Sequence, residues 1–92
     1  MMSGADIAKI RKNLNMTQAQ LGQLLGVHPL TVSKWERDIL KPSPHQGAML
    51  HSFRKARENK PDIGDIVIGI LVGAGVALAI YAILEAAFGK GK

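Results

Sequence analysis

The sequence of 92 residues contains no cysteine, only seven acidic residues and four aromatic ones. Without cysteine the chain cannot form a disulfide scaffold, a cysteine-based zinc site or a thiol nucleophile. The few acids do not assemble into a paired-carboxylate site, and His28, His45 and His51 have no partner ligands at metal spacing. The sequence also lacks a nucleophile elbow and a phosphate-binding loop. We therefore expect no enzyme activity, no metal and no cofactor.

Charged and apolar residues are separated along the chain. Residues 1–60 hold ten of the twelve Lys and Arg but only four of the seven acids, which gives this segment a net charge of +6. By contrast, the nineteen residues from Ile66 to Leu84 carry no charged or strongly polar side chain. The length allows one small domain with an appendage. The sequence thus combines a basic head with one apolar segment.

The length of the apolar segment predicts a membrane span. Nineteen helical residues extend over roughly 28 Å, close to the ~30 Å hydrocarbon core of a bilayer. Asp65 and Glu85 flank the segment, so their charges would lie at the edges of the bilayer, where they are tolerated. The alternative is a buried helix in a soluble oligomer, but a small chain has little other apolar surface to cover such a helix. We predict a single transmembrane helix over 66–88.

The flanking cations predict the orientation of this span. Four lie before it, Arg54, Lys55, Arg57 and Lys60. Only two follow it, Lys90 and Lys92. The positive-inside rule then puts the head in the cytoplasm, as in a single-pass, tail-anchored protein of a prokaryotic cytoplasmic membrane. We assign the four preceding cations to anionic lipid headgroups rather than to DNA.

Small residues recur within the predicted span. Gly69, Gly73 and Ala77 have the i, i+4, i+8 spacing that lets membrane helices approach closely, which predicts a homo-oligomer. A second set lies nearly opposite on the helix: Gly75, Ala79, Ala82 and Ala86. Glycine and alanine are also simply frequent in membrane helices, which is the alternative explanation.

Two helices are predicted in the first part of the head. Apolar residues from Ile7 to Leu14 follow the i, i+3, i+7 spacing of an amphipathic helix. Thr17, with Gln20 three residues later, forms the capping-box pattern that starts a second helix. Gly26 suits the end of that helix, because glycine readily adopts the left-handed conformation.

Two more helices complete the head. Pro29 suits the first turn of a third helix that runs to about Arg37, and Ser43 can cap a fourth helix. The predicted fold is all-α, a small four-helix head with a single C-terminal transmembrane helix. Its parts are the head (1–56), a basic juxtamembrane linker (57–65), the membrane helix (66–88) and a short tail (89–92).

The stretch TQAQLGQLLGVHPLTVSKWERD resembles the Cro/repressor-type helix-turn-helix family, whose pattern is T-Q-x-x-L-A-x-x-L-G-V-S-x-x-T-V-S-x-W-E-x-G. The likeness extends from about Ile7 to Phe53. It implies that the third helix is the recognition helix and that the partner is double-stranded DNA. The residues implied to contact DNA are Gln18, Leu30, Thr31, Ser33, Lys34 and Arg37. The resemblance also implies an ion pair between Arg11 and Glu36 and core positions for Val32 and Trp35.

The sequence departs from the family pattern at several positions. His28 stands where the family has a Ser or Thr cap, and Pro29 and Leu30 replace polar residues that read bases. Proline donates no hydrogen bond and leucine can contact only a thymine methyl group, so direct readout rests mainly on Lys34. Asp38 replaces the glycine that ends the recognition helix, and the final helix of the family is expected to be missing.

Two functions follow from these features. The first is a membrane-anchored helix-turn-helix protein that regulates transcription or tethers DNA at the cytoplasmic membrane face. The second is an oligomeric or accessory subunit of a larger membrane complex, whose head makes protein contacts. The intact motif and the basic head favour the first, whereas Pro29, Leu30 and the two sets of small residues favour the second.

Overall fold

The computed structural model describes residues 2–89, and this part of the chain contains six α-helices and no strand. They are α1 (Gly4–Asn13), α2 (Gln18–Leu25), α3 (Pro29–Glu36), α4 (Pro44–Asn59), α5 (Ile63–Gly73) and α6 (Val76–Phe88). The predicted all-α fold is confirmed. Residues 90–92 of the predicted tail, with Lys90 and Lys92, lie outside the described residues.

Reciprocal side-chain caps start three of the four helices of the head, which comprises α1 to α4. Thr17 Oγ1 accepts a hydrogen bond from the backbone N–H of Gln20 at 3.0 Å, while the Gln20 side chain accepts from the Thr17 N–H at 2.8 Å. Ser43 forms the same reciprocal pair with Gln46. The predicted caps of α2 and α4 are therefore confirmed. Ser3 caps α1 in the same way, which the sequence analysis did not predict.

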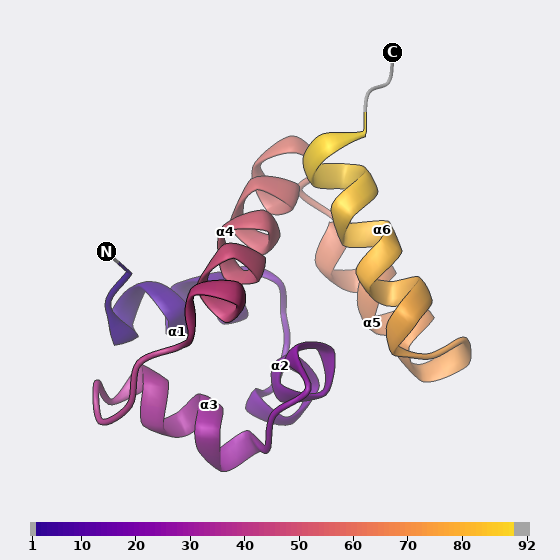
Figure 1. The fold of residues 1–92 in the computed structure, drawn as a ribbon. Coiled ribbons are helices and arrows are strands. Elements are labelled where there is room, and N and C mark those ends of the chain that lie inside the picture. Colours follow the sequence, from indigo (N-terminus) through magenta and orange to yellow (C-terminus); the bar gives the residue numbers. More distant parts are fainter. Residues whose placement is uncertain (1, 90–92) are drawn as a thin grey trace.

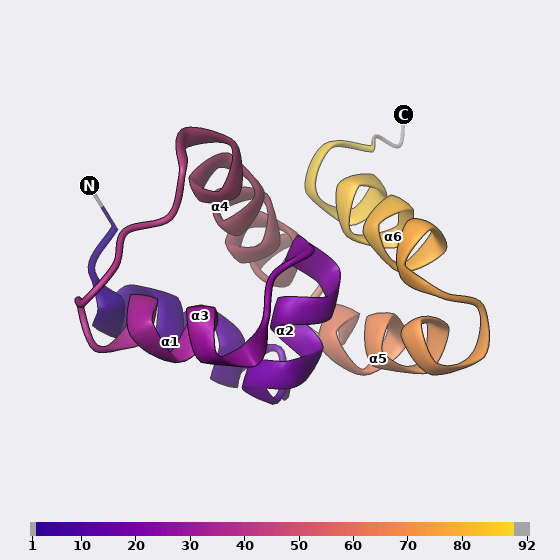
Figure 2. The ribbon, with the colours of Figure 1, turned by 60° about the horizontal axis from the view of Figure 1, so that its bottom comes forward.

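Buried side chains from all four helices form the core of the head. α1 packs against α3 and α4, and α2 packs against α3 (Figure 2). The fully buried residues of largest volume include Trp35, Phe53, Ile7, Leu14, Leu21 and Leu50. Burial of such side chains contributes roughly 1.5–3 kcal/mol each before the entropy of ordering them is counted. This core fixes the orientation of α3 against the rest of the head.

The apolar segment is divided into two helices that form a hairpin, α5 and α6 (Figure 1). The chain turns at Ala74 and Gly75, where the Ile70 carbonyl accepts from both backbone N–H groups, at 2.6 and 3.0 Å. Gly75 has φ +102° and ψ 177°, a region of conformational space that is essentially restricted to glycine. Residues 66–88 are therefore not one continuous helix, because the helical conformation is interrupted at this glycine.

The hairpin packs on the head rather than extending away from it. α6 contacts α4 and α2, and α5 contacts α4. Val67 and Ile83 are completely buried, one from each helix of the hairpin, and they join the same apolar cluster as the core of the head. The head therefore covers one face of each helix of the hairpin. In this way the small chain buries part of its long apolar segment.

Two specific contacts anchor the hairpin. The Asn59 side chain, at the end of α4, donates to the carbonyl oxygens of Ala86 and Ala87 at 3.1 and 3.2 Å. These carbonyls belong to the last turn of α6, where no intrahelical donor is available. At the other end, Gly64 lies against the Leu14 backbone so closely that a Cβ atom would be 2.7 Å from the Leu14 Cα.

The predicted transmembrane helix is wrong. None of the helices among residues 2–89 is both long enough and apolar enough to cross a membrane. The prediction of a single-pass protein in the prokaryotic cytoplasmic membrane is withdrawn with it. Length and hydropathy predict a span only for one continuous helix, whereas the chain here turns at Ala74 and Gly75.

The small residues that predicted helix packing in lipid do not lie at a helix interface of this chain. Gly69, Gly73 and Ala77 are all exposed, and Ala77 belongs to a different helix from the two glycines. A Cβ atom added at Gly69 or Gly73 would meet no atom within 4 Å. An oligomer contact at this set remains untested. The predicted linker 57–65 spans the end of α4, a turn and the start of α5.

Candidate nucleic-acid interface

α2 and α3 are joined by a three-residue turn whose geometry depends on two glycines. Gly26 ends α2 with φ +73°, the left-handed conformation predicted from the sequence. The Val27 N–H donates to the Gly22 carbonyl at 2.8 Å, and a Cβ at Gly22 would be 2.6 Å from the Val27 carbonyl oxygen. The absence of a side chain at Gly22 thus allows the turn to fold back against α2. This close approach sets the angle between α2 and α3.

His28 caps the N-terminus of α3. Its Nδ1 accepts a hydrogen bond from the Leu30 backbone N–H at 3.0 Å. The imidazole therefore replaces the hydroxyl that caps this helix in the family pattern. Pro29 occupies the first turn, where a missing N–H costs nothing. The departure from Ser or Thr at this position therefore leaves the start of α3 intact.

One face of α3 is buried and the opposite face is open. Val32 and Trp35 are 0% and 1% exposed and point into the head. The remaining side chains include four with the i, i+3, i+4, i+7 spacing of a single helix face, namely Leu30, Ser33, Lys34 and Arg37. Thr31 lies at the edge of this face and is half-buried. We call these five residues the α3 face.

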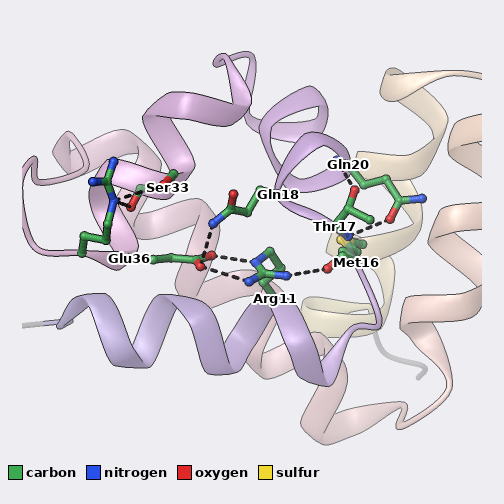
Figure 3. Close-up of polar contacts among 8 residues, drawn as sticks. Arg11, Met16, Thr17, Gln18, Gln20, Ser33 and Glu36 are labelled. Carbon is green, nitrogen blue, oxygen red and sulfur yellow. Dashed lines mark hydrogen bonds and ion pairs between the residues drawn. The ribbon is translucent and has the colours of Figure 1, made fainter.

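Polar contacts arrange part of the α3 face before any ligand binds. The Arg37 Nε donates to the Ser33 carbonyl and hydroxyl oxygens at 3.3 and 3.2 Å (Figure 3). Leu30 is 52% exposed, so the α3 face also presents one apolar side chain to a partner. Lys34 is half-buried, and its position on the exposed helix face makes its ammonium available to an anionic partner.

A hydrogen-bond network ties α3 to α1 and α2 (Figure 3). Arg11 forms two hydrogen bonds with Glu36, from Nε to Oε2 at 2.7 Å and from Nη2 to Oε1 at 3.0 Å. The remaining Arg11 Nη1 donates to the Met16 carbonyl at 3.0 Å. Gln18 Nε2 also donates to Glu36 Oε1, at 3.1 Å. The structure therefore brings together the two residues that the family resemblance pairs, and adds Gln18 to them.

This network shifts the ionisation of both charged partners. Partial burial raises the pKa of Glu36, but the hydrogen bonds from Arg11 and Gln18 and the Arg11 charge outweigh it, so the net pKa is lowered. The hydrogen bond to Glu36 raises the pKa of Arg11. Both groups are therefore charged across the physiological range. Gln18 points at Glu36 in this structure, so a DNA contact by its side chain would have to share or exchange that bond.

A second link holds the end of α3, and sequence reasoning missed it. Asp38 adopts φ +60°, and its Oδ1 accepts from the Gly4 N–H at the start of α1, at 2.8 Å. A Cβ at Gly4 would lie 2.6 Å from the Trp35 carbonyl oxygen, so α1 and α3 touch directly here. Aspartate adopts the left-handed conformation more readily than most residues, but its partner 34 residues away could not be predicted from local spacing.

The comparisons with known proteins agree with this geometry. Residues 7–46 match the helix-turn-helix family. The chain is also 36% identical over 61 residues to the repressor protein C2 of Salmonella phage P22. This alignment covers 66% of the chain and 27% of the relative, so the chain spans about a quarter of the relative's length. No solved structure matches the chain significantly.

The family resemblance is thus confirmed for a helix-turn-helix domain that includes α2 and α3. The matched region ends at Gln46, within the first turn of α4. The rest of α4 and the whole hairpin lie beyond it. The hairpin therefore lies outside the residues that match the family, and it packs on α4 and α2 without any substantial contact to α3.

The four cations assigned to lipid headgroups lie on or just after α4, away from the α3 face. Arg54 and Lys55 are exposed, Arg57 is half-buried and Lys60 follows the end of the helix. An Arg54 Nη2 lies 2.8 Å from Nδ1 of His51. The assignment depended on an adjacent membrane span, and it loses its basis because residues 63–88 fold as a hairpin.

Proposed function

We propose that this chain binds double-stranded DNA through α3 and acts as a repressor-type regulator of transcription. The observation that carries the proposal is the α3 face: one open helix surface with two cations, held in place by the Arg11–Glu36 pair on its buried side. A helix of this kind enters the major groove with its exposed residues toward the bases. The name of the phage P22 relative, a repressor protein, supports the same function.

The proposed contacts divide into two kinds. Lys34 and Arg37 supply charge for phosphates or for guanine, while Thr31 and Ser33 offer hydroxyl groups to base edges. Leu30 would contact a thymine methyl group, which is the apolar feature of the major groove. The net charge of +6 on residues 1–60 adds a sequence-independent attraction to DNA. The proposed complex therefore combines a few base contacts with an attraction to phosphates that does not depend on sequence.

Titration of the full chain against duplex DNA over a range of salt concentrations tests the proposal. We expect the logarithm of the affinity to fall linearly with the logarithm of salt concentration, because binding releases counterions from phosphates. Lys34→Glu should weaken binding at least tenfold and reduce that slope by about 1 or more. Enrichment of bound sequences from a random pool would then identify the operator.

The matched control is Lys55→Glu, which makes the same charge change on the exposed surface of α4. We expect its affinity for DNA to stay within about twofold of the unmodified chain. Absence of binding at low salt, or equal losses in the two variants, would contradict the proposal. The first result would favour the other function, in which the exposed Leu30 and its neighbours contact a protein.

A further inference from the structure

A pocket lies between α1 and α4, on the side of α1 that is turned away from α3. Asp6, Lys9, Ile10 and Asn13 line it from α1, and three residues line it from α4. Lys9 and Arg11 are two positions apart, so their side chains leave the helix about 200° apart, and Arg11 is the residue that holds α3. We call this space, about 290 Å³ in volume, the α1–α4 pocket. Its volume is close to the lower limit of about 300 Å³ for small-molecule sites.

Positive charges outnumber negative ones in the α1–α4 pocket. Lys9, Arg54 and Arg57 are the cations of its lining. Asp6 and Glu58 are its acids, so the net charge is three minus two, or +1. Among residues 2–89, no carboxylate oxygen comes within 4.0 Å of a cationic nitrogen of this pocket. The charges of the pocket are therefore not neutralised by close ion pairs.

The Arg57 side chain has a buried hydrogen-bond donor without an acceptor. Its Nε is inaccessible to solvent, and none of residues 2–89 accepts a hydrogen bond from it. Such a donor is costly on a charged group, because burial removes its hydration and nothing replaces it. Ile10, which is 4% exposed, borders the same pocket, and its side chain offers no acceptor. A ligand oxygen in the pocket would supply the acceptor once the half-buried Arg57 side chain turns toward it.

Two other polar residues of the pocket already have partners. The Asp6 Oδ2 accepts a hydrogen bond from the Ser3 N–H at 2.9 Å, and the hydrogen bonds from Ser3 keep the pKa of Asp6 below its ordinary value. The Arg54 Nη2 lies 2.8 Å from Nδ1 of His51, one turn earlier in α4. The remaining donor groups of the lining belong to Lys9, Asn13 and Arg57.

We propose that the α1–α4 pocket binds a small anion through phosphate or carboxylate oxygens. Two of the three remaining donor groups are cationic, and charge-assisted hydrogen bonds to such oxygens are about twice as strong as neutral ones. The Arg57 guanidinium presents its donors in a planar fork that matches an oxyanion. Asn13 adds a neutral amide donor, and a singly charged ligand neutralises the net charge of the pocket. The bound anion joins α1 to α4 and thereby stabilises the head.

A phosphate of duplex DNA carries the same chemistry, but the position of the pocket favours a free anion. The pocket lies on the side of α1 opposite to the Arg11–Glu36 contact with α3, and the α3 face is the surface proposed to meet DNA. In Figure 1, α4 extends upward from α1 while α3 lies below it. Anion binding is therefore a separate proposal from DNA binding and is measured without DNA.

Thermal unfolding of the full chain, followed by circular dichroism, tests the proposal. Inorganic phosphate and succinate are added separately at neutral pH, each compared with sodium chloride at the same ionic strength. A ligand that binds only the folded chain raises the unfolding midpoint with the logarithm of its concentration above Kd. We expect at least one of the two probes to raise the midpoint by about 4 °C or more at a tenfold excess over its Kd.

Variants separate binding from a general salt effect, since phosphate also stabilises folded proteins by exclusion from their surface. Lys9→Gln and Arg57→Gln should each weaken binding at least tenfold, with each variant compared with its own midpoint in the absence of the probe. The matched control is Lys12→Gln, which makes the same charge change on an exposed residue of α1 outside the pocket, and it should respond like the unmodified chain. Lys9 is also exposed, so Lys9→Gln decides the test if Arg57→Gln fails to fold.

The Nε–H resonance of Arg57 gives a direct measurement of binding. In nitrogen–proton correlation spectra it is assigned by its absence from Arg57→Gln. We expect it to move in a saturable way as the effective probe is added, and this titration gives the Kd. A resonance that neither probe moves overturns the proposal.

The remaining outcomes identify the ligand or exclude the site. A response to phosphate alone identifies a phosphate ligand, and a response to succinate alone identifies a carboxylate. Equal responses in Lys9→Gln and Lys12→Gln overturn the proposal, because exclusion from the surface then explains the stabilisation. Loss of DNA affinity in Lys9→Gln without a response to either probe also overturns it and assigns the pocket to a DNA phosphate. Lys34→Glu should lose DNA affinity while keeping the response to the anion, so failures of the two proposals are distinguishable.

Discussion

Arg11 and Glu36 join the end of α1 to the end of α3 through a two-pronged ion pair, with Nε–Oε2 and Nη2–Oε1 distances of 2.7 and 3.0 Å. Their side chains are only 14% and 9% exposed, so water does little to screen the pair. The planar guanidinium matches the carboxylate geometry, which a lysine ammonium could not do. The proposed DNA-binding helix is thereby fixed on the side opposite its open face.

Loss of Arg11 should therefore be costly. We expect Arg11→Met, which keeps the aliphatic stem, to lower the free energy of unfolding by about 2–4 kcal/mol, because Glu36 is left charged and largely buried. Urea denaturation followed by circular dichroism measures the change. The double variant Arg11→Met/Glu36→Leu should recover part of the loss, since no unpaired charge remains. Strictly additive effects of the two substitutions would show that the pair contributes no coupling.

The same pair should make stability depend on acid. The folded-state pKa of Glu36 is lowered from its ordinary value of 4.5, so its contribution is fully present above that value and is lost as the pH falls through the folded pKa. We expect the midpoint of thermal unfolding to fall as the pH is lowered below about 4.5, and to fall less steeply in Glu36→Gln.

Asp6 provides the comparison for this pH experiment. Hydrogen bonds from Ser3 lower the pKa of Asp6, but its carboxylate is on the surface. Asp6→Asn should therefore keep most of the acid dependence that Glu36→Gln removes, because solvent screens an exposed carboxylate. If the unmodified chain and Glu36→Gln show the same slope between pH 3 and pH 5, the pair does not control acid stability.

Local signals predicted the helices of the head well. Thr17 with Gln20 and Ser43 with Gln46 mark helix starts because each pair satisfies backbone groups within four residues. Gly26 marks a helix end for an equally local reason, its left-handed conformation. The residues of the α3 face were implied by the family resemblance, and most of them have the spacing of a single helix face. The Arg11–Glu36 pair, 25 residues apart, came from the family resemblance and not from spacing.

The hairpin could not be predicted by the same means. Gly75 is one of several glycines in the segment, and hydropathy does not show which of them adopts φ +102°. The contacts that favour a hairpin over a straight helix are distant in sequence, such as Asn59 with Ala86 and Gly64 with Leu14. Uniform hydropathy was consistent with both a membrane span and two packed helices. Tertiary contacts decided between them.

Gly64 should be essential for docking of the hairpin. A methyl group at this position would overlap the Leu14 backbone, which belongs to the core of the head and cannot move aside cheaply. We expect Gly64→Ala to lower the free energy of unfolding by roughly 1–3 kcal/mol. Gly69→Ala, on the same helix but with open space around its Cβ position, should instead raise it by about 0.5–1 kcal/mol. Urea denaturation of both variants gives the comparison, and stabilisation by Gly64→Ala would contradict the docked arrangement.

Gly75 should control the reversal between α5 and α6. No other residue type adopts its backbone conformation without strain, so Gly75→Ala should destabilise the chain by about 1–3 kcal/mol or straighten the segment. The two results differ in far-ultraviolet circular dichroism, because fusion of α5 and α6 would increase the helical signal.

Gly73→Ala is the matched control, two residues away at the end of α5. Its Cβ position is open and its φ is not positive, so the substitution should leave stability unchanged or slightly improved. Equal stability and equal spectra for Gly75→Ala and Gly73→Ala would show that the turn does not depend on the conformation of Gly75. A larger loss confined to Gly75→Ala would show that the hairpin depends on the backbone conformation of this one glycine.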